Sequence, residues 1–205
     1  MGRIFWALVA VFLLITATLA AGPQPKTHDG FFLRMLPGIG YAESVEEDVL
    51  GEDFTLSGST GIFLFQIGGA VANNMILYGE FGGNTMTDPE VEWAGMTVST
   101  DETSLSVFGV GIGLGYYFMP GNIYVSASIN MSQVTLEVDG ESSESDPGIG
   151  TWLMVGKEWW VGKRANWGLG LALAFHYSVV EAEDFGETHD VRNLATGLAF
   201  SATLN

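Results

Sequence analysis

Three side chains near the end of the chain have the residue types that perform acyl transfer. His176 and Ser178 are separated by one residue, and Asp190 follows fourteen positions after His176. A serine hydroxyl, an imidazole and a carboxylate are the parts of a nucleophilic triad, in which the imidazole takes the serine proton. A hydrolase is therefore one hypothesis. The alternative, which we favour, is a structural histidine facing a protein interior.

A second group of candidate residues is charged. Arg34, Glu80 and Glu158 occur in stretches that are otherwise mostly apolar or small. Charges in a water-poor interior must be paired, because an isolated buried charge is costly. We expect Arg34 to pair with the two carboxylates and to plug the interior; a gated ion path is the alternative. Lys157 precedes Glu158, so its side chain must face the opposite way and snorkel to an interface.

Most of the acidic residues lie in four segments. Residues 42–57 hold six acids, and 83–103, 137–148 and 180–190 hold five each, without any Lys or Arg. Their carboxylates could bind Ca²⁺ or Mg²⁺ loosely; the candidates are Glu46, Glu47, Asp48, Asp101, Glu102, Glu181, Glu183 and Asp184. No His or Cys cluster has the spacing of a transition-metal site, so no other metal and no cofactor is expected. A net charge of −17 argues against nucleic acid as a partner.

The elements that must position these residues are strands. Beyond residue 30, apolar residues recur at every second position, and no long window keeps helical spacing. The pattern predicts eight strands: Gly30–Tyr41, Gly61–Val71, Met75–Gly82, Leu105–Phe118, Ile123–Leu136, Ile149–Val161, Trp167–Val179 and Asp190–Leu204.

One predicted strand indicates what its two faces contact. In GVGIGLGYYF, residues 109–118, glycines alternate with Val110, Ile112 and Leu114. A lipid-facing side must be apolar, whereas the interior of an eight-stranded barrel is only wide enough to be filled by side chains. We therefore expect the glycines to face inward and leave room for larger side chains. The same alternation in the strand that follows Trp167 turns His176 and Ser178 inward.

The connections between the strands favour a membrane barrel. Short connections follow the second, fourth and sixth strands, and the four acidic segments follow the first, third, fifth and seventh. Short turns alternating with long polar loops are typical of outer-membrane barrels. The predicted fold is all-β, an eight-stranded antiparallel up-and-down transmembrane β-barrel over residues 30–205. The alternative is a soluble β-sandwich, whose strands also alternate.

The N-terminal residues are typical of an export signal. Arg3 is followed by the apolar run Ile4–Ile15 and by small residues that end at Ala20 and Ala21. We expect a signal peptide over residues 1–21, with an uncleaved membrane anchor as the alternative, and a short leader over 22–29. The expected location is the bacterial outer membrane.

Two stretches carry a family resemblance. DGFFLRMLPGIGY and GKEWWVGKRANWGLGLALAF resemble outer-membrane barrel proteins of myxobacteria, and the pattern over residues 30–205 is similar to the OmpA transmembrane domain and OmpX. The resemblance implies an internal salt-bridge cluster that plugs the barrel. Barrels of this type commonly end in an aromatic residue, whereas this chain ends Ala202-Thr203-Leu204-Asn205.

The His-x-Ser pair followed by an acid also resembles the lipid A deacylase family of eight-stranded barrels. In that family the pair faces lipid and the acid is Glu, whereas here parity turns the pair inward, Val179 follows the serine and the acid is Asp190. We therefore expect a monomer with a structural or interaction role through four acidic extracellular loops. Its expected partners are outer-membrane lipid, lipopolysaccharide and the barrel assembly machinery. An envelope-lipid enzyme and a narrow ion pore are the alternatives.

Overall fold

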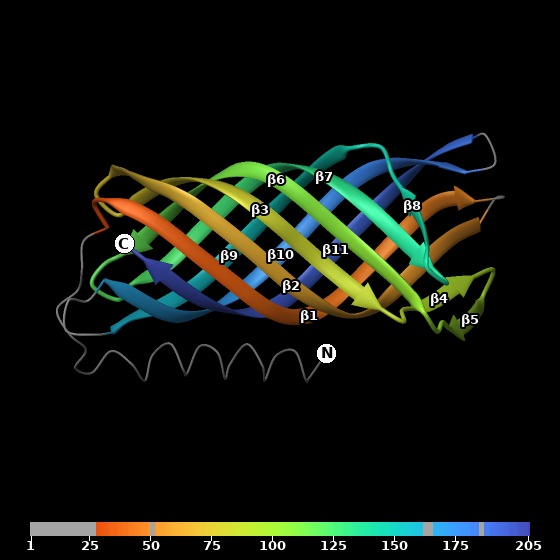
Figure 1. Ribbon diagram of the computed structural model, residues 1–205, viewed down its shortest axis with the longest axis horizontal. Coiled ribbons are helices and arrows are strands. Elements are labelled where there is room, and N and C mark those ends of the chain that lie inside the picture. The colour runs from red at the N-terminus through yellow and green to blue at the C-terminus, as the bar shows by residue number, and fades with distance from the viewer. Residues whose placement is uncertain (1–27, 50–51, 162–165, 185–186) are drawn as a thin grey trace.

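The structure is a β-barrel whose strands are tilted relative to its long axis (Figure 1). The computed structural model describes residues 28–49, 52–161, 166–184 and 187–205. Within them the strands are β1 (Phe31–Val49), β2 (Glu52–Ala72), β3 (Met75–Thr87), β4 (Glu90–Trp93), β5 (Met96–Ser99), β6 (Thr103–Phe118), β7 (Ile123–Val138), β8 (Glu141–Glu144), β9 (Gly148–Val161), β10 (Trp167–Asp184) and β11 (Glu187–Leu204). No helix in these ranges is long and apolar enough to span a membrane. The expected signal peptide and leader residues 22–27 lie outside them.

Eight of the strands form a closed antiparallel ring in the order β1-β2-β3-β6-β7-β9-β10-β11, with β11 paired to β1. The predicted fold class is thereby confirmed. The short strands are additions to this ring, because β4 pairs with β2 and β5, and β8 pairs with β7. They lie at one end of the barrel, called here the hairpin end, and the short β2–β3 and β6–β7 connections lie at the other, the turn end (Figure 1).

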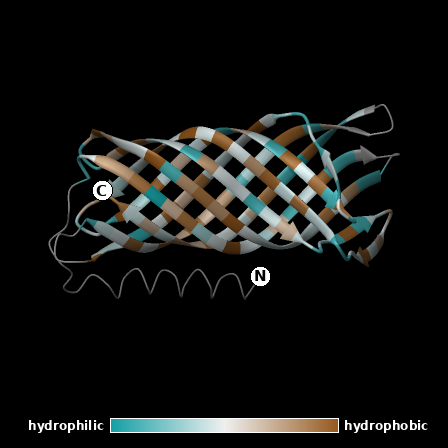
Figure 2. Ribbon diagram, in the orientation of Figure 1, coloured by the Kyte–Doolittle hydropathy of each residue, from teal (hydrophilic) through white to brown (hydrophobic). Residues whose placement is uncertain are grey.

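The two faces of the ring strands alternate as expected. On β6 the outward side chains are exposed, and Ile112 is 64% exposed. Apolar residues recur along the strands through the middle of the barrel (Figure 2). A Cβ at Gly113 would overlap the ring of Tyr78, which β3 sends into the lumen. The glycine face of residues 109–115 therefore makes room for larger inward side chains from the neighbouring strands.

The strands extend farther at the hairpin end than the sequence pattern predicted. β1 continues to Val49 instead of ending at Tyr41, and β2 begins at Glu52 instead of Gly61. Residues 180–190 likewise belong mostly to β10 and β11, while 83–103 and 137–148 contain the short strands β4, β5 and β8. The prediction of four long loops is wrong because alternation persists: inward positions keep apolar side chains such as Ala42, Val180 and Ala182, and exposed acids such as Glu43 and Glu181 lie on outward positions.

Side chains fill the interior in layers. A hydrophobic cluster toward the turn end includes Leu36, Leu64, Tyr78, Tyr124, Trp152 and Met154. A second cluster, toward the hairpin end, includes Ala42, Leu56, Met86, Leu105, Val107, Val134, Val180 and Val191. Between them, buried polar residues follow one another on the inward positions of two strands, from Ser126 to Ser132 on β7 and at His176 and Ser178 on β10.

Candidate functional site

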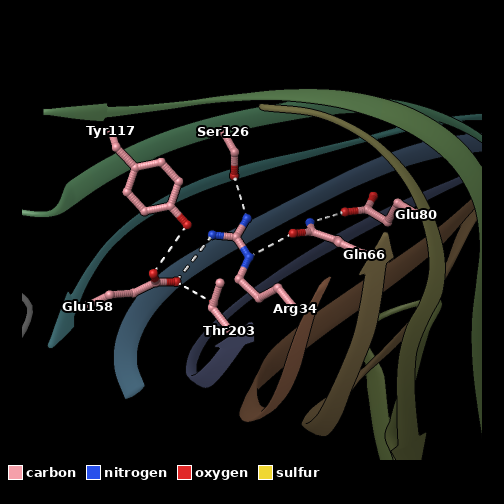
Figure 3. Close-up of polar contacts among 7 residues, drawn as sticks. All are labelled: Arg34, Gln66, Glu80, Tyr117, Ser126, Glu158 and Thr203. Atoms are coloured by element: carbon pink, nitrogen blue, oxygen red, sulfur yellow. Dashed lines mark hydrogen bonds and ion pairs between the residues drawn. The ribbon is translucent and has the colours of Figure 1, made fainter. Parts of the chain in front are cut away.

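The charged cluster predicted for the interior is centred on Arg34. β1 turns this side chain inward, and its Nη1 lies 3.8 Å from Oε1 of Glu158 on β9. Each residue is only 1% exposed. Arg34 Nε donates a hydrogen bond of 2.8 Å to Gln66 Oε1, and the guanidinium lies 4.2 Å from the centre of the Tyr124 ring. Figure 3 shows the guanidinium between partners from opposite walls of the barrel.

Glu158 has further donors besides Arg34. The Thr203 hydroxyl on β11 donates to Oε1 over 2.6 Å, and the Tyr117 hydroxyl on β6 donates to Oε2 over 3.2 Å (Figure 3). The adjacent strand β10 contributes space instead of a polar group. A Cβ at Gly168 would lie 3.1 Å from Glu158 Oε2. The absence of a side chain at this position therefore makes room for the Glu158 carboxylate.

Glu80 is linked to Arg34 through another residue. Gln66 accepts from Arg34 and donates through Nε2 to Glu80 Oε2 over 2.5 Å (Figure 3). The Ser128 hydroxyl donates to the other Glu80 oxygen, also over 2.5 Å. The plug, defined here as Arg34, Gln66, Glu80, Tyr117, Ser126, Ser128, Glu158 and Thr203, thus receives a residue from every ring strand except β10. Its hydrogen bonds join opposite walls across the lumen.

The residues just before β1 cover the turn end of the barrel. His28 is fully buried, and its ring stacks on Tyr117 at 3.6 Å between centroids. Its backbone forms two hydrogen bonds with the β2–β3 connection: His28 N donates to Asn74 Oδ1, and Asn74 N donates to His28 O. The end of the predicted leader is therefore packed beneath the plug.

The predicted triad residues do not assemble. His176 and Ser178 face inward and are 2% and 0% exposed. His176 stacks on Trp152 at 4.4 Å, and the Ser178 hydroxyl accepts a hydrogen bond from Asn193 Nδ2. Asp190 pairs with Glu181, three positions beyond Ser178 on β10, or about 10 Å along the strand. Asp190 is also exposed, so its carboxylate is not placed to orient the buried His176 ring.

Lys157 faces the opposite side of β9 from Glu158, as the alternation of side chains along a strand requires. Its Nζ donates to the Gly121 carbonyl of the β6–β7 connection over 2.5 Å and lies 5.5 Å from the Trp159 ring centre. The ammonium group thus reaches the turn end of the outer wall. The basic pair Lys163 and Arg164, in the next short connection, falls outside the residues that the structure describes.

The acidic candidates for cation binding are dispersed over the hairpin end. Glu47 forms an ion pair of 2.6 Å with Arg192, a basic residue that the neighbouring strand β11 supplies. Asp101, Glu102 and Glu181 are exposed, and Glu46 is half-buried at the barrel mouth. The side chains of Asp48, Glu183 and Asp184 are not among the described ones. In the described part of the chain, no group of three His, Cys, Asp or Glu side chains is placed to hold a metal ion.

Sequence reasoning missed most of the partners of the charged residues. Gln66, Ser126 and Ser128 had a usable signal, because each occupies an inward position in an alternating strand. Tyr117 and Thr203 have the same parity. Parity alone does not give the height of a residue in the barrel, however, because height depends on the stagger between paired strands.

No protein-family model and no curated protein matches the sequence. Solved structures do match the fold. OprG from Pseudomonas aeruginosa aligns with a TM-score of 0.53 and 10% identity over 87% of this chain and 98% of its own. Neisserial surface protein A gives 0.49 and 15% over 85% and 96%, and AlkL gives 0.48 and 13% over 90% and 95%. The chain has the fold of the small bacterial outer-membrane β-barrel proteins.

Proposed function

We propose that the protein is a closed, monomeric outer-membrane barrel that acts through the acidic surface of its hairpin end. The observation that carries this proposal is the plug. Arg34 and Glu158 meet across the lumen, and aromatic side chains fill the space around them. An interior that is hydrogen-bonded from wall to wall supports a barrel that is closed to ions. What remains available to other molecules is the outside of the barrel.

The orientation follows from the connections and the charge. Short turns of outer-membrane barrels face the periplasm, so the hairpin end faces the medium. On β1 the exposed Glu43 follows the exposed Tyr41 on the outward face, which places carboxylates directly above the apolar band. Lipopolysaccharide also carries anionic groups, and Ca²⁺ or Mg²⁺ can bridge two sets of oxygen ligands. Cation-bridged contact with lipopolysaccharide is the interaction that this surface fits best.

The two alternative functions lack a supporting contact. A lipid hydrolase needs its nucleophile at a lipid ester, whereas Ser178 is fully buried and faces the lumen. A pore needs a path past Arg34, whose guanidinium contacts Glu158, Gln66 and Ser126. We therefore propose neither activity.

The test combines location and closure. The protein is fractionated, its gel mobility is compared with and without boiling, and the purified barrel is added to planar lipid bilayers. Outer-membrane location, heat-modifiable mobility and electrical silence are the expected results. Stable conductance steps would refute the closed interior, and a soluble periplasmic protein without a mobility shift would refute the whole proposal.

Binding to lipopolysaccharide is tested separately by cosedimentation of the reconstituted barrel with lipopolysaccharide vesicles. Ca²⁺ should increase the bound fraction and EDTA should remove that increase. Binding that EDTA leaves unchanged would refute the cation bridge.

A further inference from the structure

We infer that the free edge of β5 binds an extended polypeptide segment in which basic and apolar residues alternate. β5 is the last strand of the sheet, and among the described strands it pairs with β4 alone (Figure 1). The chain continues from β5 into β6, and β6 pairs with β7 on the side that β5 leaves open. β7 ends at Val138, opposite Thr103, so it does not reach β5. The open side of β5 is therefore a place for one more strand.

Two residues of β5 direct their backbone hydrogen-bonding groups to this edge. Residues 94–95, between β4 and β5, have φ of 50° and 76°, which is typical of a two-residue type I′ hairpin turn. The pair that flanks such a turn is hydrogen-bonded, and bonded pairs then alternate with non-bonded ones. Thr100 N donates to Pro89 O over 3.3 Å, in agreement with this alternation. The N–H and C=O groups of Thr97 and Ser99 thus point away from β4.

The sequence of β5 leaves its edge open to pairing. Met96–Ser99, with the sequence MTVS, contains no charge and no proline, two of the devices that keep exposed edges from pairing. All four residues are exposed. β8, which pairs with β7 at its own edge of the sheet, instead carries Glu141 and Glu144 at its two ends and has polar side chains on both faces. β5 is thus the edge that suits a strand with an apolar face.

The two faces of the β4–β5 hairpin differ, because paired residues of an antiparallel sheet share a face. The acidic face is formed by Glu90, Glu92, Thr97 and Ser99. The apolar face is formed by Val91, Trp93, Met96 and Val98. Met96 and Val98 are each 61% exposed. A strand added to β5 would therefore have its side chains alternately on the acidic face and on the apolar face.

Charge complementarity sets the side chains on the acidic face. A residue opposite Thr97 lies two strand spacings from Glu92, or about 10 Å across the sheet. Thr97 is short, so a Lys or Arg side chain can extend over it with its apolar stem and reach the Glu92 carboxylate. Ser99 and Glu90 repeat this arrangement two residues along the strand. Basic residues at every second position thus meet both glutamates, and apolar residues between them pack on the other face.

A second copy of the chain fits this edge poorly. Two β5 strands paired antiparallel would join their sheets with the acidic faces on the same side, so that Glu90 and Glu92 of both copies share one surface. Each copy also carries a net charge of −17. Like charges facing one another suppress an association, whereas opposite charges favour it. The edge therefore selects a basic polypeptide over a copy of itself.

The probe is the end-capped peptide Lys-Val-Lys-Val-Lys-Val, which is long enough to cover the four residues of β5. It is titrated into the purified barrel in phosphatidylcholine nanodiscs, with ¹³C-methyl methionine as the reporter. The methyl signal of Met96 should shift saturably, because a peptide valine packs beside it. Met131, which is 65% exposed on the lipid-facing wall, should not shift. Lys-Lys-Lys-Val-Val-Val and Glu-Val-Glu-Val-Glu-Val should each bind at least about tenfold more weakly.

Methylation of the peptide backbone tests the strand pairing. In an antiparallel pairing the peptide residues opposite Thr97 and Ser99 exchange hydrogen bonds with them, and these residues are the lysines. N-methylation of the lysine amides should therefore weaken binding at least about tenfold. The valine amides point away from β5, so their N-methylation should weaken binding less than about threefold.

Variants of the protein test the same edge. Thr97→Pro removes an N–H that faces the peptide and no hydrogen bond of the hairpin, so binding should weaken at least about fivefold. Glu90→Gln and Glu92→Gln should each weaken binding about twofold to fivefold. Glu141→Gln is the matched control, because Glu141 is an exposed acid of the other edge strand, and should leave binding unchanged.

Four results would each overturn the inference. They are the absence of a saturable shift at Met96, equal binding of the block peptide, equal weakening by the two methylated peptides, and full affinity of the double variant Glu90→Gln with Glu92→Gln. Heat-modifiable mobility of each variant shows that its barrel has folded, so loss of binding is read only from closed barrels.

The inference rests on the proposed function only for the side of the membrane from which the polypeptide arrives. Pairing at the β5 edge needs no divalent cation, so EDTA should leave peptide binding unchanged, whereas it should remove the Ca²⁺-dependent binding to lipopolysaccharide. Ion conductance, a periplasmic location or failure to bind lipopolysaccharide would contradict the proposed function. None of these results would alter the peptide titration, which alone decides the inference.

Discussion

Replacing Glu158 with glutamine should remove the charge that balances Arg34 while keeping the size of the side chain. Both residues are 1% exposed, and Glu158 is the carboxylate within ion-pair distance of the guanidinium. Removing one partner of a buried pair leaves the other charge uncompensated and costs about 3–5 kcal/mol. The glutamine amide oxygen can still accept from Thr203, so the hydrogen-bond contribution to the loss is small. We expect Glu158→Gln to lower the free energy of unfolding by about 3–4 kcal/mol.

The same substitution at Glu80 is the control. Glu80 accepts from Gln66 and Ser128 and has no direct contact with Arg34 in the structure. Glu80→Gln leaves one donor facing an amide NH₂, a loss of about 1–2 kcal/mol. Urea unfolding in lipid vesicles, followed by the gel mobility shift, measures both values. Equal losses for the two variants, within about 0.5 kcal/mol, would refute the assignment of Glu158 as the partner of Arg34.

A double variant tests the pairing directly. Arg34→Met together with Glu158→Gln removes both charges, so its cost should fall short of the sum of the two single costs by about 1–3 kcal/mol. Additive losses would mean that the two side chains stabilise the barrel independently, in conflict with their contact across the lumen.

Three further predictions address the walls of the barrel. Gly113→Ala should lower stability by about 1–3 kcal/mol because its Cβ overlaps the Tyr78 ring, whereas Gly61→Ala, with open space around it, should change little. Ile112→Arg should cost about 2–4 kcal/mol in lipid, because it places a charge on the lipid-facing side; a neutral result would contradict membrane insertion. Ser178→Ala should leave lipid A acylation unchanged by mass spectrometry, and a change would revive the hydrolase hypothesis.

The sequence predicted the ring because lipid imposes a strict pattern on one face of each strand. Val110, Ile112 and Leu114 had to face outward, which fixed the parity of the glycines between them. The same parity correctly turned Arg34, Glu158 and His176 inward. The lipid around the barrel therefore determines which face of a strand each of these residues occupies, and the packing inside the barrel does not.

The hairpin end was harder to predict because its outward face leaves the lipid. Glu43 and Glu181 are acids in the positions that apolar residues occupy lower on the same strands, so the segments resembled loops. The inward positions nevertheless kept Ala42, Val180 and Ala182, which continue the barrel. Only the inward half of the alternation signals a strand once its outer face is in water.

The link between Glu80 and Arg34 through Gln66 could not be predicted at all. All three residues have inward parity, but which of them meet depends on the stagger of β1, β2 and β3. One sequence carries no direct measure of that stagger. The structure sets Arg34 opposite Gln66, and Gln66 opposite Glu80, which places the amide between the two charged groups.

The ion pair between Arg34 and Glu158 depends on the curvature of the whole sheet. If the β1–β11 pairing were opened and the sheet laid flat, β1 and β9 would be separated by β2, β3, β6 and β7, or about 24 Å of sheet width. The two atoms that lie 3.8 Å apart across the lumen would then be far beyond reach of each other. A spectroscopic label on this pair would thus report the moment at which the chain completes its circle, and distinguish a finished barrel from a sheet that has all its hairpins but no seam.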